Sequence, residues 1–173
     1  MRALKPILIF ILLVLIGCAV LIYSGTYNVA ADEPHAGAVK TLLNVIRNRS
    51  VHVRLDNISP PPDLNSPERV ERGGRLYGAN CAGCHLGPGQ EETPFFRGLN
   101  PQPPRLTLHG GHHDPKYQFW VIKHGIRMTG MPAWGVTKAD DQLWDLTAFL
   151  RELPEMSAET FRTRTAPEDN AGS

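Results

Sequence analysis

The most prominent pattern in the chain is an unbroken apolar run near the N-terminus. Residues 7–23 read ILIFILLVLIGCAVLIY and include no charged residue. At about 1.5 Å of rise per residue, roughly 17–20 apolar residues form a helix just long enough to cross the hydrocarbon core of a bilayer. Arg2 and Lys5 precede the run, whereas the first acidic residues, Asp32 and Glu33, follow it. This asymmetry predicts a single transmembrane helix within residues 1–25, with the remaining chain on the outer side.

Two alternatives to a retained anchor stay open for this segment. Residues 29–31, Val-Ala-Ala, resemble a small-residue cleavage site, which would make the segment a removable secretory signal. Residues 15–18, Leu-Ile-Gly-Cys, resemble a lipobox, although the residues after Cys18 are apolar where a mature lipoprotein normally turns polar. All three interpretations deliver the rest of the chain across a membrane.

Residues 26–65 are expected to form an extension that precedes the main domain. Four apolar residues recur there at helical spacing: Val39, Leu42, Leu43 and Ile46. This short amphipathic helix either contacts a membrane surface or a partner, or packs on the main domain. Residues 51–55 alternate apolar and polar side chains, a weak strand signal, and residues 60–62 are three prolines that stiffen the junction.

Helix-start signals divide the following chain into three helices. Ser66 followed by Pro67 and Glu68 predicts a helix that runs to about residue 81. Asp114-Pro115 predicts a second helix that stops at Gly125.

The third helix is expected over about residues 139–153. Thr137 and Asp140 resemble a capping box that would start it. One face carries Leu143, Leu146, Thr147 and Leu150. Residues 86–111 and 126–137 are expected to be loops, and residues 156–173 a frayed polar tail.

Composition narrows the class of protein. The 173 residues carry 18 Lys and Arg against 17 Asp and Glu, a net charge of +1. This near-neutral balance argues against a polybasic nucleic-acid binder, so no nucleic-acid partner is expected. The three cysteines are too few for a disulfide framework.

The chemistry is concentrated in Cys81-Ala-Gly-Cys84-His85. C-x-x-C-H is the attachment signature of c-type haem. Two thiols three residues apart on a helical turn reach the two vinyl groups of one haem, and the next residue directs its imidazole to the iron. A zinc site would need a further ligand pair, which His109, His112 and His113 offer on paper. A redox dithiol would need a βαβ context that the helical pattern lacks.

Residues 66–154 resemble the class I c-type cytochromes. The family places a small residue and an aromatic before the haem motif, where Gly73 and Tyr77 stand here. There the first helix crosses the last, for which Trp144 and Phe149 are the expected aromatic partners. The resemblance implies an all-α fold of three to four helices wrapped around one covalent haem. It sets the haem domain at residues 66–155.

The resemblance also implies a distal ligand. Thr129-Gly-Met131-Pro resembles the family's methionine-ligand loop, so His85 and Met131 are expected as the axial ligands. A thioether favours ferrous iron and raises the reduction potential compared with a second imidazole. Met128, a histidine and an open coordination site are the alternatives.

A proline-rich segment is expected to orient the imidazole of His85. Pro103-Pro104-Arg105-Leu106 resembles the family's Pro-x-Leu element, in which a proline carbonyl accepts the second N–H of the ligand histidine. Pro104 is the expected acceptor and Leu106 the residue that packs on the haem face. A plain proline-rich loop is the alternative. Arg105 and Trp134 are candidates for propionate contacts, and the histidines at 109–113 form either a solvated loop or a further propionate contact.

Together these features predict one-electron transfer by a monohaem cytochrome c, with haem c attached through Cys81 and Cys84. The expected location is the bacterial inner membrane, single-pass, with the haem domain in the periplasm. Redox proteins of a respiratory chain are the expected partners, and no enzymatic activity is expected of the chain alone. A cytochrome subunit of an oxidoreductase complex, and a haem sensor or weak peroxidase with a labile Met131, are the alternatives.

Overall fold

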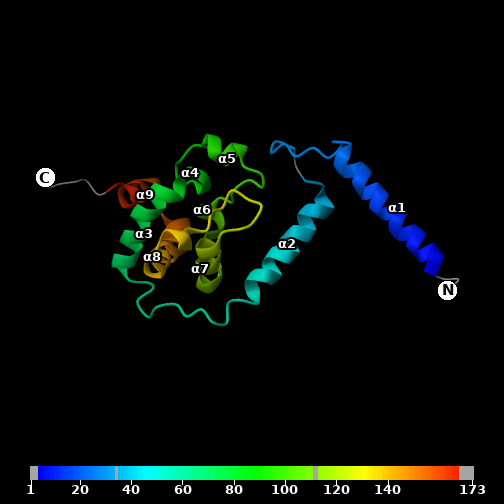
Figure 1. The fold of residues 1–173 in the computed structure, drawn as a ribbon. Helices are drawn as coiled ribbons and strands as arrows, with labels where there is room; N and C mark the ends of the chain where they lie inside the picture. Colours follow the sequence, from blue (N-terminus) through cyan, green and yellow to red (C-terminus); the bar gives the residue numbers. More distant parts are fainter. Residues whose placement is uncertain (1–3, 34, 111–112, 168–173) are drawn as a thin grey trace. The chain divides into compact units, whose positions relative to one another are not determined.

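The computed structural model describes residues 4–33, 35–110 and 113–167 (Figure 1), and within them every regular element is a helix. The chain divides into two compact units, residues 1–33 and 34–173. The α-helices of the second unit are α2 (Gly37–His52), α3 (Pro67–Asn80), α4 (Ala82–His85), α5 (Pro94–Gly98), α6 (Leu106–His109), α7 (Pro115–His124), α8 (Asp140–Glu152) and α9 (Ala158–Thr165). Two short 3₁₀ turns, η2 (Trp134–Val136) and η3 (Leu153–Glu155), flank α8.

The first unit contains one helix, α1 (Leu4–Tyr23), which is long and apolar enough to cross a membrane. Lys5 is its single charged residue, and none of its residues is buried within the protein. Length and composition of this kind suit a membrane anchor and also a signal sequence near an N-terminus.

The three main helices begin and end close to the expected positions. Ser66 caps α3 by accepting a hydrogen bond from the Arg69 amide at 3.3 Å, and Asp114 caps α7 by accepting from the Lys116 amide at 2.8 Å. Helix α7 stops at Gly125, whose φ of 64° suits glycine far better than other residues. The start of α8 differs from the expected capping box. Ala139 is its N-cap, and the Gln142 side chain accepts a hydrogen bond from the Ala139 amide at 3.1 Å.

The core forms where α3 crosses α8. A Cβ atom placed on Gly73 would lie 2.6 Å from the Asp145 carbonyl carbon and 2.9 Å from Phe149 Cβ, so only glycine permits this approach. Tyr77 and Phe149 are fully buried with ring centroids 5.1 Å apart. Trp144, in contrast, stacks on Phe119 of α7 at 4.1 Å. It therefore ties α8 to α7, and Phe149 is the aromatic residue of the α3 crossing.

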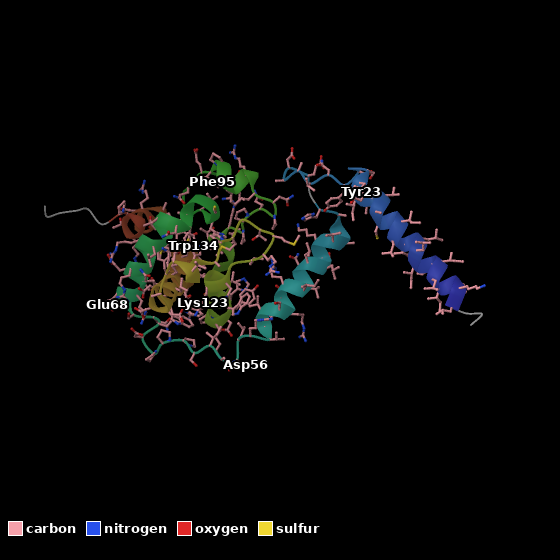
Figure 2. All side chains as sticks on the ribbon, in the orientation of Figure 1. Tyr23, Asp56, Glu68, Phe95, Lys123 and Trp134 are labelled. Atoms are coloured by element: carbon pink, nitrogen blue, oxygen red, sulfur yellow. The ribbon has the colours of Figure 1, made fainter. Side chains whose placement is uncertain are left out.

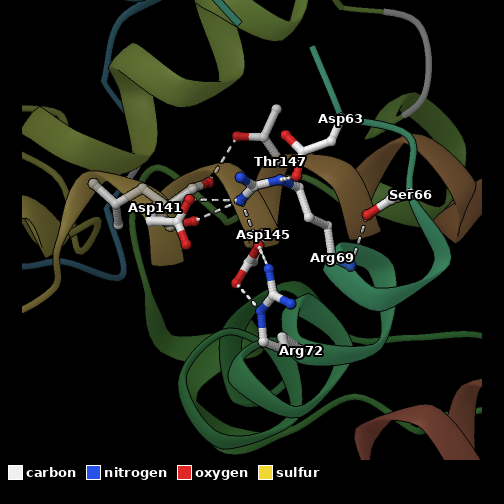
Figure 3. Close-up of polar contacts among 8 residues, drawn as sticks. Asp63, Ser66, Arg69, Arg72, Asp141, Asp145 and Thr147 are labelled. Carbon is white, nitrogen blue, oxygen red and sulfur yellow. Dashed lines mark hydrogen bonds and ion pairs between the residues drawn. The ribbon is translucent and has the colours of Figure 1, made fainter. Parts of the chain in front are cut away.

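An ion-pair cluster braces the same crossing (Figure 3). Arg69 is 7% exposed, and its guanidinium lies 2.8 Å from Asp141 and from Asp145 and 3.0 Å from Asp63. Arg72 contacts the other oxygen of the Asp145 carboxylate at 2.7 Å. Burial favours the neutral form of Arg69, but the hydrogen bonds to the three carboxylates outweigh it and raise the pKa above its ordinary value. The guanidinium therefore stays charged and links α3 to α8.

The C-terminal segment corrects the expectation of a frayed tail. Residues 158–165 form α9, which packs against α3, and Phe161 is 1% exposed with its ring 6.0 Å from Tyr77. Gly74 and Gly78 of α3 leave room for the α9 backbone at Arg164 and Thr165. Helix α9 is mostly polar. It is held against α3 by its one buried aromatic residue and by the close approach that the two α3 glycines permit.

Two further expectations need correction. Residues 51–55 do not form a strand: α2 extends to His52, and Val51 and Leu55 are both buried. The segment 86–111, expected as loop, includes the short helices α5 and α6. Thr93 caps α5 by accepting from the Phe96 amide at 3.1 Å.

Candidate functional site

The two thiols and the imidazole of the C-x-x-C-H motif lie on the turn that joins α3 to α4. Cys81 ends α3 and its carbonyl accepts hydrogen bonds from the amides of Cys84 at 3.0 Å and His85 at 2.8 Å. This tight turn places Cys81, Cys84 and His85 next to one another in space. Removal from water raises the pKa of the Cys81 thiol to about 12, so at neutral pH the sulfur is a neutral thiol.

The imidazole of His85 is oriented from a distant loop. Its Nδ1 lies 2.9 Å from the Pro104 carbonyl oxygen, which fixes Nδ1 as the protonated nitrogen and leaves Nε2 free to coordinate. Burial lowers the pKa of His85, and the bond to Pro104 opposes that shift only in part. The ring is therefore neutral at pH 7, as a metal ligand must be.

A cavity adjoins this imidazole, and its walls are apolar. The residues that line it are Tyr77, Cys81, His85, Leu106, Ile122, Met131, Leu146 and Leu150. His85 and Met131 come from segments 46 positions apart (131 − 85 = 46) and share this cavity. The alternative thioether, Met128, is 78% exposed and is not among the lining residues.

The loop that carries Met131 is held by local hydrogen bonds. The Thr129 hydroxyl donates to the Ile126 carbonyl at 2.7 Å and accepts from the Met131 amide at 3.1 Å. The Met131 carbonyl in turn accepts from the Ile126 amide at 3.3 Å. Gly125 lies so close that a Cβ there would meet the Met131 carbonyl oxygen at 2.6 Å. These contacts turn residues 126–131 back on α7 and direct the loop to the cavity.

Two residues that the sequence did not single out support the C-x-x-C-H turn. Leu86 is buried and has a φ of 61°, which is strained for a branched side chain. The buried Tyr77 hydroxyl donates to the Leu86 carbonyl at 2.6 Å and so holds this strained residue. On the other side of the turn, the Thr93 hydroxyl donates to the Gly83 carbonyl at 2.5 Å. Both bonds join separate segments, and no sequence motif marks them.

The remaining candidates are not among the residues that line the cavity. Arg105 pairs with Glu92 at 2.6 Å and lies 4.7 Å from the Phe96 ring centroid, and Trp134 is half-buried beside Lys138. His113 stacks on Tyr117, with ring centroids 5.4 Å apart. His112 and the His109 side chain lie outside the described residues. Within the described part of the chain, no group of three His, Cys, Asp or Glu side chains gathers to hold a metal ion.

The donor set and the walls of the cavity fit a covalently held haem. Two adjacent thiols suit thioether bonds, a tautomer-fixed imidazole and a thioether are suitable ligands for haem iron, and aliphatic walls suit a large apolar macrocycle. In this site, His85, Cys81 and Cys84 lie on the C-x-x-C-H turn, and Met131 lies on the loop after α7.

Comparison with known protein families identifies the central part of the chain. Residues 68–150 match the family model described as "Cytochrome C oxidase, cbb3-type, subunit III". No curated protein matches the chain. The matched residues begin in α3 and end in α8, and they include the C-x-x-C-H turn, the Pro104 carbonyl and the Met131 loop.

Proposed function

Starting from the c-type cytochrome domain that residues 68–150 form, we propose that the protein is a membrane-anchored one-electron carrier with a single haem c. The observation that carries the proposal is the shared cavity: His85 and Met131 line it together, and the remaining walls are apolar apart from Cys81 and Tyr77. A bound haem supplies an iron that alternates between the ferrous and ferric states.

Each residue of the site has a defined task in this proposal. Cys81 and Cys84 would hold the porphyrin through thioether bonds, and His85 and Met131 would supply the two side-chain ligands of its iron. Pro104 keeps His85 in the tautomer that can coordinate through Nε2, and Leu106 packs on the haem face. A methionine ligand stabilises the ferrous state and gives a higher potential than a second histidine. With His85 and Met131 both bound to the iron, the site would suit electron transfer better than chemistry on a bound substrate.

The apolar helix α1 and its charge asymmetry support the location. Arg2 and Lys5 precede the apolar run and the first acidic residues follow it, which favours an N-in, C-out orientation. We therefore place the haem domain in the periplasm of a bacterium, held to the inner membrane by α1. Tethering keeps the carrier at a high local concentration near membrane-bound redox partners.

The ligand assignment is tested by paired methionine variants. Met131→Ala is expected to lower the midpoint potential, remove the methionine–iron charge-transfer band and allow carbon monoxide to bind the reduced protein at neutral pH. Met128→Ala is the matched control, because its exposed side chain is not part of the cavity lining, and its spectrum is expected to match the wild type. An unchanged spectrum in Met131→Ala would eliminate Met131 as the ligand.

Attachment and anchoring need separate tests. Cys84→Ser is expected to reduce covalent haem, measured as haem that organic solvent no longer extracts. In membrane fractionation, the full-length chain is expected to leave the membrane only with detergent. Recovery of a shortened soluble chain would show that the segment is a cleaved signal.

A second candidate function is suggested by the description of the family. The matched model describes a subunit of a cbb3-type oxidase, so this chain is also a candidate subunit of an oxidoreductase complex. Purification in mild detergent distinguishes the two. A complex subunit co-purifies with a catalytic partner in fixed proportion, whereas a free carrier does not.

A further inference from the structure

Helix α2 exposes an apolar stripe. Val39, Leu42, Leu43 and Ile46 recur at i, i+3, i+4 and i+7 and are 44%, 59%, 39% and 55% exposed. Among the described residues, the neighbouring element with which α2 packs is α7, and α7 leaves the stripe uncovered. Figure 2 shows the α2 side chains as sticks. Four contiguous apolar side chains exposed on one helix face are typical of a surface that contacts a membrane or another protein.

The stripe lies opposite the face that α2 uses to contact its own domain. The Tyr117 hydroxyl of α7 is 3.5 Å from Asn48 Oδ1, the His52 ring is 5.6 Å from the Tyr117 ring, and Val51 is 1% exposed. At about 100° per residue, these three α2 residues centre about 180° from the stripe. Docking of α2 on α7 therefore directs the stripe away from the domain.

Charges border the stripe. Lys40 and Arg47 lie along one edge and Arg49 along the other, and the α2 sequence GAVKTLLNVIRNRSVH has no acidic residue. Long basic side chains on both edges of an apolar face can reach up to phosphate groups while the face itself enters the acyl boundary. This charge pattern favours a surface of negative charge.

The short segment between α1 and α2 keeps α2 close to any membrane that α1 crosses. Helix α1 ends at Tyr23 and α2 begins at Gly37. The 13 intervening residues, 24–36, span at most about 45 Å when fully extended. A bilayer crossed by α1 is therefore always near α2, at a high effective concentration.

We infer that α2 lies in the surface of the bilayer that α1 crosses, with the stripe in the acyl boundary and its basic borders on anionic lipid headgroups. The inference rests on the proposed membrane anchor. It gives the haem domain a second membrane contact, through α7, in addition to the tether.

The test uses the full-length holoprotein in vesicles of phosphatidylglycerol and phosphatidylcholine. In a Cys18→Ser background, single cysteines at positions 39, 42 and 46 of the stripe, and at positions 41 and 44 of the opposite face, carry nitroxide labels. The expected result is a several-fold higher ratio of oxygen to nickel-chelate collisions at the stripe positions than at positions 41 and 44. The ratio at the stripe should fall in vesicles of phosphatidylcholine alone.

A charge variant and its control isolate the headgroup contact. In the anionic vesicles, K40Q/R47Q is expected to lower the ratio of oxygen to nickel-chelate collisions at the stripe positions. The control R162Q, which replaces an exposed arginine on α9, should leave that ratio unchanged. Equal chelate access at all five positions would overturn the inference. Stripe labels shielded from both oxygen and chelate would also overturn it, because they would indicate a protein partner or a second copy of the chain.

Vesicle flotation reports the anchor separately. A chain that floats with the vesicles while its stripe stays accessible to the chelate contradicts the α2 inference alone. A chain that does not float contradicts the anchor.

Discussion

The close approach of α3 and α8 at Gly73 can be tested with a single methyl group. In Gly73→Ala the new Cβ would lie 2.6 Å from the Asp145 carbonyl carbon, whereas a normal carbon–carbon contact is about 3.5 Å. The neighbouring atoms belong to the α8 backbone and to Phe149 Cβ, so no side-chain rotation relieves the overlap. The Asp145 carbonyl oxygen would lie closer still to the new Cβ, so the two helices must separate by about 1 Å or more at this point.

The magnitude follows from two opposing effects. Forcing an extra carbon into a packed core costs about 1–3 kcal/mol, and alanine returns about 0.5–1 kcal/mol through its better helix preference. Because the obstructing atoms are backbone, we expect the upper part of the range, a net loss of about 2 kcal/mol. In a domain of this size that corresponds to a fall of about 8–16 °C in the unfolding midpoint.

The assay is thermal unfolding of the holoprotein in one detergent, followed by the haem absorption and by circular dichroism. Gly37→Ala is the matched control, since Gly37 is also helical and a Cβ added there would have nothing within 4 Å. The control should unfold at or slightly above the wild-type midpoint. If Gly73→Ala also unfolds within error of the wild type, the close crossing described above is wrong.

Three further predictions concern the supports of the domain. Arg69→Ala leaves the buried Asp145 carboxylate with Arg72 alone and should lower the free energy of unfolding by about 3 kcal/mol in chemical denaturation. Arg97→Ala, at an exposed pair with Glu92, is the control and should change it by less than about 0.5 kcal/mol. Phe161→Ala should cost about 3–5 kcal/mol by the same measurement, a loss that a frayed tail would not produce. The hydrogen bond from Arg69 lowers the pKa of Asp63, so its contribution is present at neutral pH and is lost as pH falls below the ordinary carboxyl range. Asp63→Asn should therefore be slightly less stable than wild type at pH 7, and the difference should shrink as Asp63 becomes protonated in acid, as acid titrations of unfolding would show.

Local signals were sufficient for the three longest helices within residues 66–155, α3, α7 and α8. Ser66, Asp114 and the buried face of α8 each marked an element that the structure contains. Helix α9 carried no such face. Its one buried side chain is Phe161, and the space for its backbone at Arg164 and Thr165 comes from Gly74 and Gly78 of α3. The sequence pattern of one helix does not indicate packing space that glycines of a distant helix provide.

The same distinction applies to the candidate site. Cys81, Cys84 and His85 are adjacent in the chain, so their spacing alone indicated the chemistry. Met131 and Pro104 were expected only through a family resemblance, and the structure places Met131 in the cavity with His85 and the Pro104 carbonyl on His85 Nδ1. The bonds from Tyr77 to Leu86 and from Thr93 to Gly83 had no signal, because each depends on backbone geometry that exists only after folding.

The crossing of α3 and α8 also sets how the two walls of the cavity are coupled. Arg69 and Asp145 are 76 positions apart, and the chain between them carries both His85 and Met131. The crossing of α3 and α8 holds the two ends of this segment together. Separating the two helices therefore frees both His85 and Met131, which amounts to cooperative unfolding of the domain. The hydrogen bonds of the Met131 loop lie within residues 126–131. The side of the cavity that carries Met131 is therefore held by a few local hydrogen bonds, whereas the side that carries Cys81 is held by the helix crossing.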